Sequence, residues 1–206
     1  MAAVTPVRWN HNIHYHRLLL GALPPRCKRA LDVGCGEGIV ARELRQRVAD
    51  VSAIDIDQRT IELARQQDVG GEIDYIVGDF LSFPFARETF DFVISVAALH
   101  HMDQGAALQR MSELLRPGGT IAVLGLIRSH YPRDLARDAA AHCVSYTHRL
   151  VKQHWESSAA TLWPPPTLAE TRRVAQRVLP GVRVRRHLLW RYSLVWNKPA
   201  TVTAVG

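Results

Sequence analysis

Apolar and polar positions alternate with two different periods between residues 30 and 126. Short runs rich in β-branched and aromatic residues have the length and composition of buried strands. Such strands are predicted at 30–33, 51–55, 73–77, 90–96 and 120–126. Stretches between them carry apolar residues every three or four positions, which predicts helices at 39–48, 58–67 and 104–115. Strands that alternate with helices indicate β-α-β units and therefore a mostly parallel sheet.

Two local signals mark the ends of these helices. Asp57 precedes the second helix, and its carboxylate can accept hydrogen bonds from the free amides of the first turn, so it is the expected N-cap. Residues 116–119, Arg-Pro-Gly-Gly, follow the third helix and predict a turn that leads into the next strand.

The chain departs from the simple alternation at both ends. Residues 182–185 alternate apolar and basic side chains, and 192–196 form another apolar run, so an antiparallel strand pair is expected beside the parallel strands. Residues 9–20 predict a short helix that covers a ligand, 128–166 predict an insertion, and 168–178 predict a helix. The predicted fold class is α/β: a three-layer sandwich with a mostly parallel seven-stranded sheet that ends in an antiparallel hairpin.

The composition narrows the classes of protein that fit the chain. Its apolar stretches are far shorter than the roughly 20 residues of a membrane-spanning helix. The first residues lack a secretory signal, so we expect a cytoplasmic location and no membrane partner. Three scattered cysteines suit neither a disulfide framework nor a zinc site. The net charge of +7 comes almost wholly from arginine, without a basic run interleaved with aromatic residues, so nucleic-acid binding is not favoured.

A glycine-rich turn follows the first predicted strand. Gly34, Gly36 and Gly38 stand at the head of a helix, where residues without a Cβ allow the backbone to approach a polar ligand. A dinucleotide fingerprint requires GxGxxG, whereas the third glycine here comes one residue early. Asp55 ends the second strand about 20 residues on, where a carboxylate can accept both hydroxyls of a ribose. The pattern predicts a nucleotide-like ligand, and the glycine spacing makes a dinucleotide less favoured.

The segment 31–38, Leu-Asp-Val-Gly-Cys-Gly-Glu-Gly, resembles the first motif of the class I, Rossmann-like, S-adenosylmethionine-dependent methyltransferases, and in particular their small-molecule group. Segments similar to the later motifs of the family follow in the family's order at 54–57, 78–85, 90–102 and 115–119. The resemblance implies a single methyltransferase domain over residues 1–206. Its expected parts are an N-terminal lid helix at 9–20, a cofactor-binding core at 29–126, a variable acceptor-site insertion with its helix at 127–180, and a C-terminal strand pair at 181–198.

The resemblance also implies S-adenosylmethionine as cofactor and S-adenosylhomocysteine as product. Asp55 would hold the ribose, Ile56 would pack on the adenine, and Asp79 would accept from the adenine amine or cap the following turn. Asp32 would lie near the methionine end of the cofactor or shape the glycine turn. The implied cofactor-binding residues are Asp32, Gly34, Cys35, Gly36, Gly38, Asp55, Ile56, Asp79, Phe80 and Val96.

The methyl group of a sulfonium is already activated, so catalysis can rest largely on placing the acceptor in line with it. His100 and His101 follow the fourth strand and are the candidate catalytic residues, either as a general base or as positioning groups. The alternate histidines near the N-terminus favour lid contacts over a metal, and no metal is expected. The predicted substrate-binding residues are Trp9, His11, His14, Tyr15, His100, His101, His130, Tyr131 and Tyr146.

The leading hypothesis is methyl transfer to oxygen, nitrogen or carbon of a small organic molecule, such as a bacterial specialised metabolite, by a monomer or homodimer. Residues 95–100, Ser-Val-Ala-Ala-Leu-His, replace the Asn/Asp-Pro-Pro-aromatic box of base N-methylation. A second hypothesis is an RNA or protein methyltransferase that uses the arginine-rich C-terminal region, with Arg183, Arg185 and Arg186. A third is a non-catalytic S-adenosylmethionine-binding protein.

Overall fold

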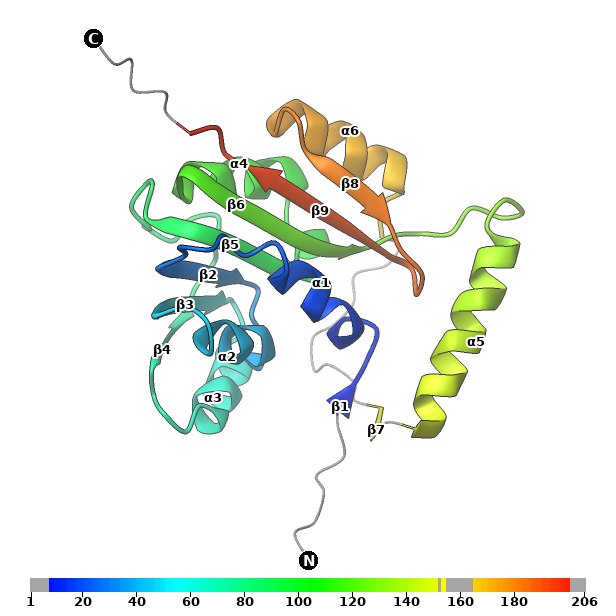
Figure 1. Ribbon diagram of the computed structural model, residues 1–206, viewed down its shortest axis with the longest axis horizontal. Helices are drawn as coiled ribbons and strands as arrows, with labels where there is room; N and C mark the ends of the chain where they lie inside the picture. The colour runs from blue at the N-terminus through cyan, green and yellow to red at the C-terminus, as the bar shows by residue number, and fades with distance from the viewer. Residues whose placement is uncertain (1–7, 152, 155–164, 201–206) are drawn as a thin grey trace, which may run out of the picture.

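A seven-stranded sheet forms the middle layer of the computed structural model, which describes residues 8–151, 153–154 and 165–200 (Figure 1). The strand order is β4-β3-β2-β5-β6-β9-β8. The strands are β2 (Arg29–Val33), β3 (Asp50–Asp55), β4 (Ile73–Val77), β5 (Phe90–Val96), β6 (Leu115–Leu126), β8 (Arg183–Arg186) and β9 (Arg191–Asn197). β4 to β6 are parallel, whereas β9 runs antiparallel to β6 and to β8. The predicted fold class is confirmed.

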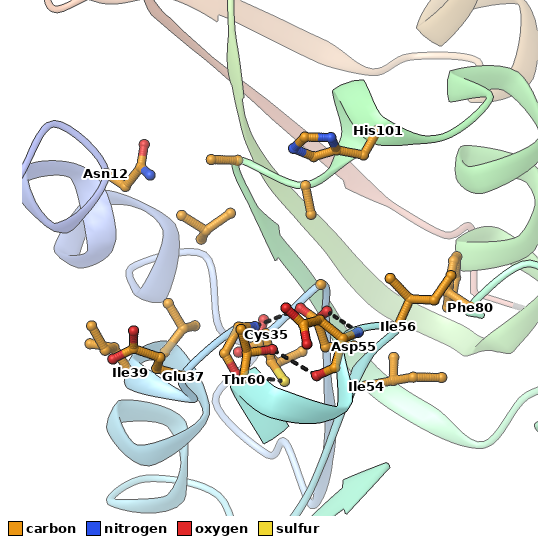
Figure 2. Close-up of a pocket in the computed structure, with 18 of the residues that line it drawn as sticks. Asn12, Cys35, Glu37, Ile39, Ile54, Asp55, Ile56, Thr60, Phe80 and His101 are labelled. Atoms are coloured by element: carbon orange, nitrogen blue, oxygen red, sulfur yellow. Dashed lines mark hydrogen bonds between the residues drawn. The ribbon is translucent and has the colours of Figure 1, made fainter. Parts of the chain in front are cut away.

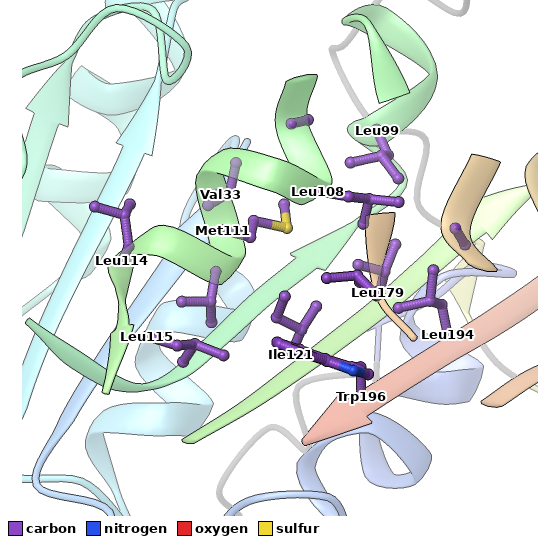
Figure 3. Close-up of a cluster of buried hydrophobic side chains, with 14 of the residues drawn as sticks. Val33, Leu99, Leu108, Met111, Leu114, Leu115, Ile121, Leu179, Leu194 and Trp196 are labelled. Atoms are coloured by element: carbon purple, nitrogen blue, oxygen red, sulfur yellow. The ribbon is translucent and has the colours of Figure 1, made fainter. Parts of the chain in front are cut away.

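Helices cover both faces of the sheet. One face carries α1 (His16–Leu20), α2 (Ile39–Arg45) and α3 (Gln58–Gln67), and the other carries α4 (Gln104–Leu114) and α6 (Leu168–Val178). Successive residues of β5 alternate between the two buried clusters: Phe92 and Ile94 pack with α1 to α3, and Val93 packs with α4 and α6. Figure 3 shows the cluster on the face covered by α4 and α6. Because β2, β3 and β5 bury both faces, they are mostly apolar, which is why their positions could be predicted.

Side-chain caps define where two of the helices begin. The Asp57 carboxylate accepts from the Arg59 amide at 2.8 Å, which confirms the predicted N-cap of α3. A capping box starts α6: the Glu170 amide donates to the Thr167 hydroxyl, and the Glu170 carboxylate accepts from the Thr167 amide at 2.8 Å.

The predicted helix at 9–20 is wrong except at its end. Arg8–Trp9 (β1) pairs in parallel with Gln153–His154 (β7), a 3-10 turn (η1) covers Ile13–Tyr15, and only α1 is α-helical. The side-chain oxygen of Asn10 accepts from the amides of Asn12 and Ile13, at 2.9 and 2.8 Å. These local bonds replace the helical ones and turn the chain before α1 begins.

Two other predicted boundaries are wrong. α2 ends at Arg45, three residues early, where the Arg45 guanidinium donates to the Val48 carbonyl at 3.3 Å. The predicted turn at 116–119 is a bulge within β6, because Phe90 pairs with Leu115 while Phe92 pairs with Thr120. Tertiary contacts hold this bulge: the Gly118 amide donates to the Lys198 carbonyl at 3.0 Å, and the Lys198 amide donates to the Gly119 carbonyl at 2.8 Å.

Helix α5 (Leu135–Val151) stands apart from the sheet, at the right of Figure 1. A small cluster of Trp9, Ala141 and Leu189 joins it to the N-terminal segment and to the turn between β8 and β9. The Trp190 indole also donates to the Asp138 carboxylate at 2.9 Å. The variable segment is thereby tied to both ends of the chain. Among the helices of the described ranges, none has the length and apolar character needed to cross a membrane.

Candidate active site

A cavity of about 430 Å³ opens where the parallel strands end at their carboxyl termini (Figure 2). This volume lies within the usual range of small-molecule sites. Its walls come from the loops after β2, β3, β4 and β5, from residues of the N-terminal segment, and from the first residue of β9. Ligands of open α/β sheets bind at this edge, so the cavity is the candidate active site.

The glycine turn brings the backbone to the cavity wall. Gly34 has a φ of 69°, and a Cβ at this position would overlap the Cβ of Ala98. Gly36 has a φ of 51°, and a Cβ there would meet no protein atom within 4 Å, because the residue faces open space in the cavity. Gly38 lies outside the lining, as the N-cap of α2. The turn therefore leaves room for a ligand at Gly36.

Asp55 connects the loops that follow β2 and β3. Its carboxylate accepts from the Gly36 amide at 2.8 Å and from the Asp57 amide at 3.0 Å. The Gly34 amide also donates to the Ile54 carbonyl at 2.8 Å. Figure 2 shows Asp55 on the wall of the cavity beside Cys35 and Thr60. These hydrogen bonds join the loops after β2 and β3 and hold the Asp55 carboxylate between them.

Asp32 is a buried carboxyl group on the same wall, with 1% of its surface exposed. Burial, above all, and the neighbouring Asp55 carboxylate raise the pKa of Asp32 to about 8. Its Oδ2 atom has no hydrogen-bond partner among the residues that the structure describes. A buried polar atom without a partner is unfavourable unless a ligand satisfies it. A cationic group with N–H donors would fit here.

The remaining predicted cofactor residues also line the cavity. Ile56 is 74% exposed on its wall, and Val96 ends β5. Asp79 accepts from the Leu81 amide at 3.0 Å, so it also caps a turn. Burial first, and then Asp32, raises the pKa of the Cys35 thiol, which therefore stays protonated. Phe80 is buried with the core beneath.

His100 and His101 lie in a short 3-10 helix (η2, Leu99–His101) on the opposite wall, with ring centroids 4.0 Å apart. Burial first, and then the charges of His101 and Arg191, lower the pKa of His100 to about 4. Its Nδ1 atom is buried without a hydrogen-bond partner in the described part of the chain. His100 is therefore a neutral imidazole near pH 7 that can still form hydrogen bonds with a bound molecule.

The N-terminal segment faces the cavity with other residues than those predicted. Asn10, Asn12, Ile13 and His16 line it. The structure places Trp9, His11, His14 and Tyr15 outside the lining, since the turn at Asn10 directs them toward α5 and the hairpin. The Trp9 ring stacks on His148 with centroids 4.6 Å apart, His11 Nε2 lies 3.0 Å from Ser145 Oγ, and the Tyr15 hydroxyl donates to the Leu188 carbonyl at 2.9 Å.

The predicted substrate residues of the variable segment also lie outside the cavity lining. Tyr131 and Tyr146 are 85% and 65% exposed, and the His130 amide donates to the Asp134 carboxylate at 2.7 Å. Within the described ranges, no three His, Cys, Asp or Glu side chains gather as a metal ion would require. Arg191, which no sequence pattern singled out, lines the cavity instead.

Comparisons with known proteins agree with this geometry. Residues 31–123 match a family model described as a methyltransferase domain. An uncharacterized methyltransferase of Mycobacterium tuberculosis is 37% identical over 93% of this chain and 98% of its own length. The 27-O-demethylrifamycin SV methyltransferase of Amycolatopsis mediterranei is 32% identical over 59% of this chain and 47% of its own. An S-adenosylmethionine-dependent methyltransferase structure from Mesorhizobium loti aligns with a TM-score of 0.61 and 16% identity, covering 88% of this chain and 96% of that one.

The fold and the glycine-edged cavity define an enzyme of the Rossmann-like methyltransferase class. The chain belongs to the class I S-adenosylmethionine-dependent methyltransferases, as the resemblance of its motifs predicted.

Proposed function

We propose that this enzyme binds S-adenosylmethionine along β2, β3 and β4 and transfers its methyl group to a small organic acceptor held near β5 and β9. The buried, unpartnered Oδ2 atom of Asp32 carries the cofactor assignment, because the cofactor's ammonium group can supply the donors and the positive charge that this atom lacks. The bound cofactor supplies a methyl group activated by the sulfonium.

The other residues of the cavity suit the rest of this cofactor. The fixed carboxylate of Asp55 can accept from the ribose hydroxyls beside the open space at Gly36. Ile56 and Phe80 provide apolar surface for the adenine, and Asp79 provides an acceptor for its amine. With the cofactor held at one end of the cavity, the acceptor occupies the end bounded by Asn12, His100 and His101.

The enzyme's main contribution to the transfer is to place the acceptor. A pKa near 4 makes His100 a weak base at neutral pH, so we assign it to hydrogen bonding with the acceptor. His101, which is exposed on the same turn, is the better placed of the two to pass a proton to water where the acceptor must lose one. Substituting His100 should therefore affect KM more than the pH profile of kcat.

Two observations support a small acceptor. Relatives that match about half of this chain carry names such as demethylmenaquinone methyltransferase, from Roseiflexus castenholzii, and 27-O-demethylrifamycin SV methyltransferase. Of the arginines considered for RNA or protein binding, Arg183 and Arg185 lie on the edge strand β8. Arg186 is engaged in an ion pair with Asp134 at 2.7 Å. This basic edge is separated from the cavity by β9.

Calorimetry and a labelled-transfer experiment test these two parts. S-adenosylhomocysteine should bind the wild-type protein, and Asp32→Asn and Asp55→Ala should each weaken binding at least about 10-fold. Equal affinity in all three proteins would contradict the cofactor site. A cell extract incubated with the enzyme and methyl-labelled S-adenosylmethionine should then be separated by size. Label in a small-molecule product other than S-adenosylmethionine is expected, whereas transferred label confined to RNA or protein would contradict the proposed acceptor class.

A further inference from the structure

Charged side chains are segregated along the cavity. Its carboxylates come from β2, from β3 and from the loops after β2, β3 and β4, and they belong to Asp32, Glu37, Asp55, Asp57 and Asp79. Arg191, the first residue of β9, is the one arginine or lysine in the described lining. The carboxylates suit S-adenosylmethionine, which carries a net positive charge. The proposed cofactor does not by itself account for the arginine.

Arg191 is buried without a carboxylate partner. It is 8% exposed, and its Nε donates to the Asn12 side-chain oxygen at 2.8 Å. Its Nη1 donates to the carbonyls of Leu189 and Trp190, at 3.0 and 3.4 Å. Within the described ranges no Asp or Glu forms an ion pair with it, and burial lowers its pKa to about 10 despite the nearby Tyr15. Buried charges in proteins are normally paired, so this guanidinium lacks a counter-ion.

The strand order places Arg191 at the acceptor end of the cavity. Arg191 pairs with Leu126 at the carboxyl end of β6, and β9 is three strands away from β2. Neighbouring strands are about 4.8 Å apart, and Asp32 is level with Val195, four residues along β9, so the backbones of Arg191 and Asp32 are separated by more than about 14 Å. Arg191 and His100 line the same cavity, and the charge of Arg191 contributes, after burial and His101, to the lowered pKa of His100. It is therefore closer to η2 than to the proposed methionine site at Asp32.

We propose that Arg191 binds a carboxylate of the methyl acceptor, and that the acceptor is an organic acid. The inference rests on the proposed function and names its substrate class. A guanidinium carries a positive charge at neutral pH, and its N–H groups form strong charge-assisted hydrogen bonds with carboxylates. Nη2 makes no hydrogen bond among the described residues, so its two N–H groups remain available to such a ligand. The bound carboxylate supplies the missing counter-ion and brings the acceptor beside His100.

Matched acids and amides test this assignment without any need for turnover. Protein saturated with S-adenosylhomocysteine is titrated with 4-hydroxybenzoate, 4-hydroxybenzamide, hexanoate and hexanamide, and binding is followed by saturation-transfer NMR. At least one acid should bind about 10-fold or more tightly than its amide. Arg191→Met should abolish this preference, and Arg191→Lys should retain part of it, because an ammonium keeps the charge but loses the fixed donor geometry of the guanidinium. Arg185→Met, on the exposed edge strand, is the control and should behave like the wild type.

Several results would overturn the inference. The inference is wrong if neither acid binds the wild-type protein, or if each acid binds no more tightly than its amide. It is also wrong if Arg191→Lys and Arg191→Met keep the wild-type preference for the acid over the amide. A loss of S-adenosylhomocysteine affinity of 10-fold or more in Arg191→Met would show that the guanidinium serves the cofactor's own carboxylate. Failure of the wild-type protein to bind S-adenosylhomocysteine would instead reject the proposed function, so the two failures are distinguishable.

Discussion

In the proposed cofactor site, a single carboxyl group, that of Asp32, should couple protonation to ligand binding. Its pKa near 8 means that it is neutral at pH 6 and becomes charged as the pH approaches 8. Only the charged form attracts an ammonium group. The affinity for S-adenosylhomocysteine should therefore rise between pH 6 and 8, and binding at pH 7 should release protons. Calorimetry in buffers of different ionisation enthalpy measures both effects, and an affinity independent of pH over this range would contradict the prediction.

The same residue should oppose folding of the ligand-free protein. A carboxyl group whose pKa is raised in the folded state contributes stability that is complete below its unfolded pKa of about 4 and is lost as the pH rises through about 8. Asp32→Asn has no such group. Its free energy of unfolding should exceed that of the wild type at pH 8, although it binds S-adenosylhomocysteine more weakly. Urea titrations at pH 5 and pH 8 provide the comparison, and a less stable variant at pH 8 would argue against this account.

Gly125 is a second residue with a specific requirement. It pairs with Tyr192 across β6 and β9, and a Cβ at this position would overlap the buried tyrosine ring. Gly125→Ala should lower the free energy of unfolding by about 1–3 kcal/mol, because the ring must move within a packed core. Gly105→Ala, in the first turn of α4, is the control and should change stability by less than about 1 kcal/mol. Equal stability of both variants would refute the steric argument.

At the scale of secondary-structure elements, an ion pair joins the start of α5 to strand β8. Asp134, just before α5, receives both terminal nitrogens of Arg186 on β8 at 2.7 Å and the His130 amide at 2.7 Å. These bonds, led by the Arg186 side chain, lower the pKa of Asp134 to about 2. The stability that they provide should be complete above pH 4 and lost as the pH falls toward 2.

Asp134→Asn should therefore release α5 from the hairpin. We expect a loss of about 1–3 kcal/mol in the local stability of α5, measured as faster amide hydrogen exchange in residues 135–151 at pH 7. Glu72→Gln is the control, because it breaks the more exposed ion pair with Arg45. It should change the amide hydrogen exchange of residues 135–151 by much less. Unaltered exchange of α5 in Asp134→Asn would show that the pair does not hold the helix.

Periodic sequence patterns predicted the strands and helices with regular contacts. They missed the features that depend on one specific side chain or on residues far away along the chain. The central parallel strands β2, β3 and β5 are mostly apolar, because they bury both faces. The bulge at 116–119 depends on Lys198, and the break of the N-terminal helix depends on the Asn10 side chain. The residues of the glycine turn could be predicted, since they directly follow a strand. Arg191 could not, because only the pairing of β9 with β6 brings it to the cavity.

At the scale of the molecule, two packed layers surround the sheet, while α5 belongs to a smaller cluster with Trp9 and Leu189. Trp9 is 1% exposed, and its neighbours in the same segment line the cavity. Trp9→Ala should leave the exchange of α4 unchanged, accelerate that of α5, and weaken S-adenosylhomocysteine binding several-fold. Leu18→Ala, at a 46% exposed position of α1, is the control. If amide hydrogen exchange becomes equally faster in α4 and α5, the two helices belong to a single cooperative core instead.

The position of β9 between β6 and β8 also affects the order in which the protein can assemble during synthesis. The strands that carry the proposed cofactor site are complete once Leu126 has left the ribosome, but the growing chain then exposes the unpaired edge of β6. β9 pairs with that edge only after about seventy more residues have been synthesised. The same pairing brings Arg191 to the cavity. A nascent chain should thus form its proposed cofactor site before Arg191 completes the acceptor end, with bound cofactor stabilising the intermediate.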